Sequence, residues 1–232
     1  MAGRRVGAGT ALTHVTRPTG LLGGSFNPAH GGHRAISLAA MAALGLDELW
    51  WLVSPGNPLK PRQGMAPLPA RLASAQRAAR RSRIRVTAIE AELGTRYTVD
   101  TLRLLVRRYP QRRFIWLMGA DNLGQLPRWR DWRTIARLMP IAVIARPGYN
   151  GRARATRAMG WLRRFVRPAD QKRHWTDWRP PALVFLRFPP DVRSATMIRQ
   201  ADPRWHERIP GHALRDPLTR RRVRAQAKKE QT

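Results

Sequence analysis

The sequence predicts an α/β protein in which a single domain contains a doubly wound parallel sheet. Apolar segments typical of strands alternate with segments of helical periodicity along most of the chain. Several strand segments are apolar throughout, which is the pattern of parallel strands covered on both faces. The length of 232 residues suits one such domain, and no linker is long enough to separate two.

The expected elements follow one another with short connections. The strands, chosen for their continuous apolar character, are expected over residues 20–24, 49–53, 84–89, 114–118, 141–145 and 182–188. The helices, chosen for apolar residues three or four apart, are expected over residues 32–45, 67–82, 98–108, 123–125, 132–139 and 194–200. In the helix over 98–108, Val99, Leu102, Leu105 and Val106 are predicted to share one apolar side.

Three segments lie outside this alternation. Residues 1–19 contain three Arg and no acidic residue, and they lack the apolar core of a secretory signal. This composition resembles a transit peptide, but we expect a disordered extension, with the domain over residues 20–212. Residues 152–173, with eight basic residues and one acidic residue, form either an amphipathic helix or a mobile insertion. Residues 213–232 are expected to form a C-terminal helical extension that frays into a basic tail.

The composition excludes several classes of protein. There is no cysteine, which excludes disulfides, Cys-ligated zinc or iron–sulfur sites and a cysteine nucleophile. No apolar run approaches the about 18–20 residues that cross a bilayer. We therefore expect a cytoplasmic protein with no membrane partner.

The charge is strongly basic, with 44 Lys and Arg against 14 Asp and Glu and a net charge of +30. Clustered basic residues are typical of nucleic-acid-binding proteins, because they release counterions from the phosphate backbone. Forty of the 44 are Arg, however, and they are spread along the whole chain. We therefore favour an arginine-rich solvated surface that also reflects a coding bias.

One stretch carries recognisable chemistry: residues 23–33, GGSFNPAHGGH. An expected strand ends in Gly23 and Gly24, and Ser25 adds a hydroxyl before the next helix. Glycines let backbone N–H groups approach a phosphate, and a helix N-terminus supplies positive potential. His30 and His33 lie on one face of the first helical turn, where they can contact phosphate oxygens. Two His at this spacing can also bind a metal ion, but no third ligand is evident nearby, so we predict no protein metal site.

A His-x-Gly-His motif after a strand and turn is the signature of the nucleotidyltransferase superfamily. Further motifs, in the same order, are similar to those of bacterial nicotinate-nucleotide adenylyltransferases. These motifs are YTVDTL at 97–102, GADN at 119–122, Trp129 with Trp132, RPG at 146–148 and SATMIR at 194–199. The resemblance covers residues 20–199 and implies a Rossmann-like fold. It also implies attack of a mononucleotide phosphate on the α-phosphorus of ATP, with loss of pyrophosphate.

The resemblance assigns roles on the ATP side. His30, His33, Lys60 and Arg199 would stabilise the phosphates during transfer. ATP would contact Gly23, Gly24, Ser25, Phe26, Gly119, Asp121, Ser194, Thr196 and Arg199. Asp121 would accept the ribose hydroxyls, although it is also placed to cap the helix that follows. Two departures weaken single contacts: Leu59 stands where the family often has His, and Ala195 replaces a Ser.

The acceptor side is implied in the same way. Trp129 would stack on the pyridine ring of nicotinate mononucleotide, Thr98 would hold its carboxylate, and Lys60 would reach its phosphate. Mg²⁺ would accompany ATP through phosphate oxygens and water. Nicotinamide mononucleotide, phosphopantetheine and a nucleic-acid-binding role on the same fold are the alternatives. The sequence also leaves open a homo-oligomer and an anionic partner for the basic segments.

Overall fold

The structure, a computed structural model, describes residues 16–56, 64–145, 155–189, 194–209 and 214–224. Within them, six strands form one sheet in the order β3-β2-β1-β4-β5-β6, and all neighbouring strands are parallel. The strands are β1 (Arg17–Gly24), β2 (Glu48–Val53), β3 (Ile84–Thr87), β4 (Arg112–Gly119), β5 (Ile141–Ala145) and β6 (Leu183–Arg187). The chain runs outward from β1 to β3 and returns to β4 beside β1, which is the doubly wound Rossmann order. The predicted fold class is confirmed.

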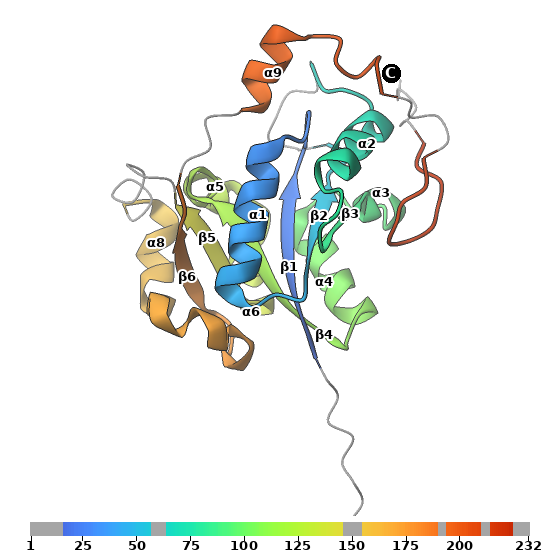
Figure 1. The fold of residues 1–232 in the computed structure, drawn as a ribbon. Coiled ribbons are helices and arrows are strands. Elements are labelled where there is room, and N and C mark those ends of the chain that lie inside the picture. The colour runs from blue at the N-terminus through green and yellow to red at the C-terminus, as the bar shows by residue number, and fades with distance from the viewer. Residues whose placement is uncertain (1–15, 57–63, 146–154, 190–193, 210–213, 225–232) are drawn as a thin grey trace, which may run out of the picture.

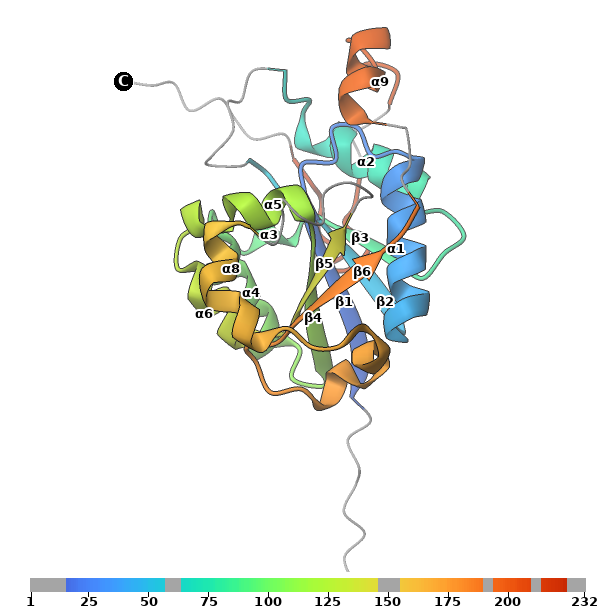
Figure 2. The same ribbon diagram turned by 90° about the vertical axis from the view of Figure 1, so that its left-hand side faces the viewer.

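Helices cover both faces of the sheet (Figures 1 and 2). The helices are α1 (Gly31–Leu44), α2 (Leu68–Ala78), α3 (Ile89–Glu92), α4 (Thr98–Arg108), α5 (Ala120–Gln125), α6 (Trp132–Leu138), α8 (Arg157–Leu162) and α9 (Ala195–Ala201). Three 3₁₀ turns accompany them: η1 (Leu126–Arg128), η2 (Arg163–Phe165) and η3 (Ala169–Asp177). One apolar cluster joins α1, α2 and η3 to one face, and a second joins α4, α5, α6 and α8 to the other. The core therefore lies in two layers on either side of the sheet.

Local chemistry explains where the main elements begin and end. β2 is buried along almost its whole length, as its apolar sequence predicts. Helix α1 stops at Gly45, whose left-handed φ of 64° suits a residue without a side chain. Helix α4 has the predicted bounds and buries Val99, Leu102 and Leu105, but Val106 is exposed, contrary to prediction.

Some expected boundaries are wrong. β1 begins at Arg17 rather than at residue 20, so residues 17–19 are ordered in the sheet. Helix α2 ends at Ala78 rather than 82; the chain turns over residues 79–81, where Arg81 adopts a left-handed φ of 53°. β3 ends at Thr87, whose hydroxyl accepts from the N–H of Ile89 and helps to start the unpredicted α3. For residues 152–173, either an amphipathic helix or a mobile insertion was expected; the described part instead forms the short helix α8, η2 and the start of η3.

The C-terminal segment also differs from prediction. Residues 214–224 form a turn closed by a bridge between Arg215 and Arg222, not a helix. The buried carboxylate of Asp216 accepts from the backbone N–H groups of Leu218 and Thr219, which competes with helix formation. It also accepts from the hydroxyl of Thr87, so this segment is fixed beside β3.

Candidate active site

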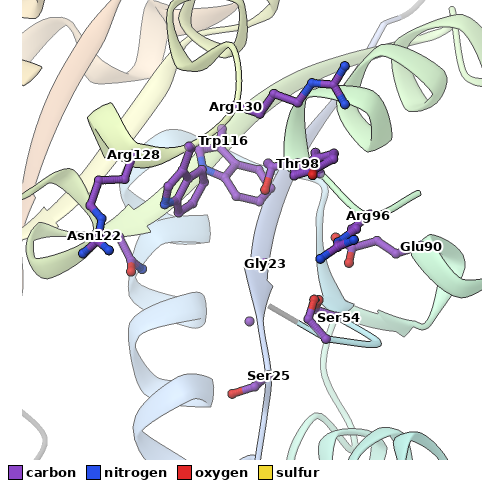
Figure 3. Close-up of a pocket in the computed structure, with 14 residues that line it drawn as sticks. Gly23, Ser25, Ser54, Glu90, Arg96, Thr98, Trp116, Asn122, Arg128 and Arg130 are labelled. Carbon is purple, nitrogen blue, oxygen red and sulfur yellow. The ribbon is translucent and has the colours of Figure 1, made fainter. Parts of the chain in front are cut away.

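A pocket opens beside the carboxyl ends of the central strands (Figure 3). It lies where the order of the strands changes: β2 and β3 are added on one side of β1, and β4 to β6 on the other. Its lining residues are Gly23, Gly24, Ser25, Ser54, Gly56, Glu90, Arg96, Tyr97, Thr98, Trp116, Asn122, Arg128, Trp129 and Arg130. The fold thus brings the predicted phosphate-binding glycines together with the predicted acceptor residues Thr98 and Trp129. In Figure 3, Ser25 lies at one end of the pocket and Thr98 and Trp116 lie at the other.

The turn after β1 is held in an unusual shape. Phe26 adopts φ 47°, a left-handed conformation that is costly for an aromatic residue and often marks a functional site. Its ring stacks on Trp51 at 4.9 Å and lies 5.0 Å from the ring of His33. A Cβ at residue 23 would lie 2.6 Å from Cη2 of Trp116, so Gly23 is required by packing as well as by any phosphate.

Both histidines of the motif are oriented by the start of α1. Nδ1 of His30 accepts from the N–H of Gly32 at 3.1 Å, and Nδ1 of His33 accepts from the N–H of His30 at 3.3 Å. A neutral imidazole that accepts at Nδ1 carries its proton at Nε2. The centres of the two rings lie 4.0 Å apart, so both imidazoles lie together at the start of α1. These two bonds orient both rings at the start of α1.

Arg71 connects the loop after β1 to the loop after β2 through hydrogen bonds. The sequence did not predict this role. Its guanidinium is buried and donates to the carbonyl oxygens of Ser25 at 2.8 Å and Ser54 at 2.6 Å. It donates further to the carbonyl oxygens of Pro55 and Ala66. Burial lowers the pKa of Arg71 to about 10, so it is charged at neutral pH.

Glu90 is the acidic residue of the pocket lining. Burial raises its pKa to about 7, although a hydrogen bond from Ser54 and the charge of Arg71 act in the opposite direction. In Figure 3, Glu90 lies beside Arg96 and Ser54 along one wall. Its protonation therefore changes the pocket's charge near neutral pH. Neither Arg71 nor Glu90 belongs to a motif that distinguishes it in the sequence.

The wall around Trp129 is aromatic and basic. The rings of Trp116 and Trp129 meet edge to face at 6.4 Å. The guanidinium of Arg130 lies 4.8 Å from the centre of the Tyr97 ring. Tyr97 is the residue that follows Arg96 in the chain. Three lining arginines, at positions 96, 128 and 130, suit an anionic ligand.

Comparison with known proteins identifies the family of this chain. The sequence profile described as cytidylyltransferase-like matches residues 21–201. A protein of Erythrobacter litoralis named "Probable nicotinate-nucleotide adenylyltransferase" is 63% identical over 209 residues, which are 90% of this chain and 95% of that protein. A protein of the same name from Parvibaculum lavamentivorans is 55% identical over 181 residues, 78% of this chain and 90% of that protein. The chain belongs to the nicotinate-nucleotide adenylyltransferase family.

A solved structure supports the fold of the family. The nicotinic acid mononucleotide adenylyltransferase of Plasmodium falciparum, complexed with NaAD, superposes with a TM-score of 0.57. The match covers 79% of this chain and 83% of that one, at 14% sequence identity. At this identity, the likeness concerns the fold alone.

The other residues that the adenylyltransferase motifs single out lie at two helices, α9 and α5. Arg199, Thr196 and Ser194 lie at α9. Arg199 donates from Nη1 to the carbonyl oxygen of Asn27 at 2.6 Å and from Nη2 to Oγ1 of Thr196 at 3.2 Å. It therefore reaches the turn after β1 from α9, which crosses above that edge of the sheet (Figure 1). Ser194 caps α9 by accepting from the N–H of Met197.

Asp121 and Gly119 lie at the start of α5, outside the pocket lining. A Cβ at residue 119 would lie 2.4 Å from Oδ1 of Asp121, so Gly119 leaves space for this carboxylate. Asp121 does not cap α5, whose N-cap is Gly119, which makes the capping alternative wrong. His30 and His33 also lie outside the lining, and Lys60, Leu59 and the RPG motif lie outside the described residues.

Among the described residues, no group of three or more His, Asp or Glu side chains lies close enough together to hold a metal ion. Of the helices described, none is long and apolar enough to cross a membrane.

Proposed function

We propose that this chain joins ATP and nicotinate mononucleotide to give nicotinate adenine dinucleotide and pyrophosphate. One observation carries the proposal: a single pocket contains the glycine turn of β1 at one end and Thr98 and Trp129 at the other. These are the residue types that a phosphate and a stacked pyridine carboxylate require. The identity of 63% to a protein named for this activity supports the same conclusion.

The reaction needs no protein nucleophile. A phosphate oxygen of the mononucleotide attacks the α-phosphorus of ATP, the new P–O bond forms, and pyrophosphate leaves with the electrons of the broken bond. The protein supplies position and charge stabilisation. We assign this stabilisation to the Nε2–H groups of His30 and His33 and to the guanidinium of Arg199, with Lys60 as a further cation. Mg²⁺ enters with ATP as its phosphate complex.

The other assignments follow from the same proposal. Gly23, Gly24, Ser25 and Phe26 form the phosphate turn, while Gly119 and Asp121 hold the ribose of ATP. Ser194 and Thr196 position α9 and Arg199 over the triphosphate. The catalytic domain begins with β1 at Arg17 rather than at residue 20, and the basic tail over 213–232 includes the segment 214–224 that is fixed beside β3.

Pyrophosphate release tests the function directly. The enzyme is supplied with ATP and Mg²⁺ and with either nicotinate or nicotinamide mononucleotide at matched concentrations. We expect strong preference for the acid. Preference for the amide would overturn the carboxylate site at Thr98 but keep the mechanism. No turnover with either acceptor would overturn the proposed reaction.

A further inference from the structure

Arg96 places a positive charge on the wall that joins the two ends of the pocket. It belongs to the connection between α3 and α4, it is exposed to solvent, and it lines the pocket. In Figure 3, it lies between Thr98 at the acceptor end and Ser25 at the phosphate end, on the same wall as Ser54, with its guanidinium toward the interior. An acceptor nucleotide with its ring at Thr98 and its phosphate at the glycine turn must pass along this wall.

The backbone around Arg96 is attached to both neighbouring helices. Gly94 adopts a left-handed φ of 64°, which turns the chain shortly after α3. The N–H of Thr95 then donates to the carbonyl oxygen of Glu90 in α3 at 3.1 Å. The hydroxyl of Thr95 also shares a hydrogen bond of 2.8 Å with that of Thr101 in α4. These bonds fix the connection, so the position of Arg96 on the wall is preorganised.

The charge of Arg96 is not neutralised by a carboxylate. None of the ion pairs found among the described residues involves Arg96. Glu90 shares its wall, but burial raises the pKa of this carboxyl to about 7, so its negative charge is incomplete at neutral pH. The guanidinium lies 5.8 Å from the centre of the Tyr97 ring, which leaves its N–H groups able to donate to a ligand. Arg96 therefore suits an anionic group.

The other two lining arginines lie away from this wall. In Figure 3, Arg128 lies with Asn122 on the opposite side of the pocket, and Arg130 lies beyond Trp116. Of the three lining arginines, Arg96 is the one between the two ends.

We propose that the guanidinium of Arg96 binds the phosphate of the acceptor mononucleotide and orients it for attack on ATP. This inference rests on the proposed function. A guanidinium donates two parallel hydrogen bonds to a phosphate, and the third terminal oxygen then remains free to attack the α-phosphorus. The carboxylate stays with Thr98 and the pyridine ring with Trp129. Lys60, the other cation assigned to this phosphate, lies outside the described residues.

Removal of the phosphate from the ligand tests this contact. Calorimetry measures binding of nicotinate mononucleotide and of nicotinate riboside, which lacks the phosphate, with an ATP analogue that cannot release pyrophosphate. We expect Arg96→Gln to weaken binding of the mononucleotide about 10–100-fold, the effect of losing hydrogen bonds to a charged group. Binding of the riboside should stay nearly unchanged. Equal losses for the two ligands would overturn the proposal.

Steady-state kinetics separates the phosphate from the carboxylate, even where riboside binding is too weak to measure. Nicotinate and nicotinamide mononucleotide both carry the phosphate, so Arg96→Gln should raise KM for both by the same factor and leave KM for ATP unchanged. Arg96→Lys keeps the charge and should recover part of the loss. A changed preference between acid and amide would place Arg96 at the carboxylate and overturn the proposal. Unchanged KM for both acceptors would also overturn it.

Arg107→Gln is the matched control, because it removes the same charge from an exposed position on α4, outside the pocket lining. We expect it to leave both Michaelis constants unchanged. If Arg107→Gln raises KM for the acceptors as much as Arg96→Gln does, the net charge of the protein explains the effect and the proposal fails. Wild-type protein that binds nicotinate mononucleotide but releases no pyrophosphate with ATP would instead refute the proposed function alone.

Discussion

The two ends of the pocket are built in different ways. At the proposed phosphate end, the glycine turn lines the pocket and the two histidines lie just outside the lining. Both come from one stretch, residues 23–33, and the histidine rings are oriented by bonds within their own helical turn. At the acceptor end, Ser54, Glu90, Thr98 and Trp116 come from four separate segments. A local motif positions the first group, whereas the tertiary fold must assemble the second.

Because of this difference, we expect amino-acid substitutions at the two ends to have different effects on activity and stability. We expect a substitution of a motif histidine to lower activity with only a small loss of stability. A substitution in the groups that join separate segments disturbs stability and substrate binding together. Arg71 is the clearest example of such a joining group, since it donates to the carbonyl oxygens of Ser25 and Ser54, which both line the pocket.

The largest effect is expected for Arg71→Leu. It removes a buried cation and leaves several carbonyl oxygens without donors, so the free energy of unfolding should fall by about 3–5 kcal/mol. Urea denaturation measures this loss, and KM should rise for both substrates. Arg77→Leu, at an exposed position on the same helix, should change stability by at most about 0.5 kcal/mol. Similar losses in the two variants would contradict the joining role of Arg71.

His33→Ala should lower kcat by about 10²–10³-fold, the usual effect of removing one donor to developing charge. It also removes the acceptor for the N–H of His30, which should cost about 1 kcal/mol of stability. His33→Asn separates the two roles, because its amide oxygen replaces Nδ1 but nothing replaces Nε2. We expect Asn to restore the melting temperature and not the turnover. Recovery of turnover in His33→Asn would remove Nε2 from the mechanism.

The same contrast explains what the sequence could predict. The apolar run of β2 is a local signal, and it led to the correct expectation of a buried strand. The motif at 23–33 is also local: it placed a turn after β1 and His30 and His33 at the start of α1, while its phosphate-binding role stays a prediction. Arg71 could not be singled out, because burial distinguishes it from the other arginines and burial depends on chain segments far away. The C-terminal helix was wrongly expected because its composition does not reveal that Asp216 bonds to Thr87, 129 residues away.

Trp129→Ala tests the acceptor end. Loss of a stacking surface should raise KM for nicotinate mononucleotide by about 10–100-fold, because stacking of a base on an aromatic residue contributes about 1–3 kcal/mol. KM for ATP should change much less. Trp132→Ala is a suitable control, since Trp132 lies outside the pocket lining and packs against Trp161. An equal rise in both Michaelis constants for Trp129→Ala would contradict stacking on the acceptor.

The smallest effect concerns the proton on Glu90. Its pKa is raised from 4.5 to about 7 in the folded protein, so the native state holds this proton more tightly than the unfolded chain does. The stabilisation from this site is therefore complete below pH 4.5 and is lost as pH rises towards 7. Between pH 5 and pH 6.5, wild-type protein should lose about 1–2 kcal/mol of stability relative to Glu90→Gln, which carries no titrating group. Urea denaturation at both pH values measures this difference.

Glu92→Gln is the control, because the pKa of Glu92 is lowered and this group stays ionised over the same range. The same pH dependence in wild type and Glu90→Gln would show that Glu90 is ionised throughout, and the acceptor end would then keep a fixed charge at neutral pH.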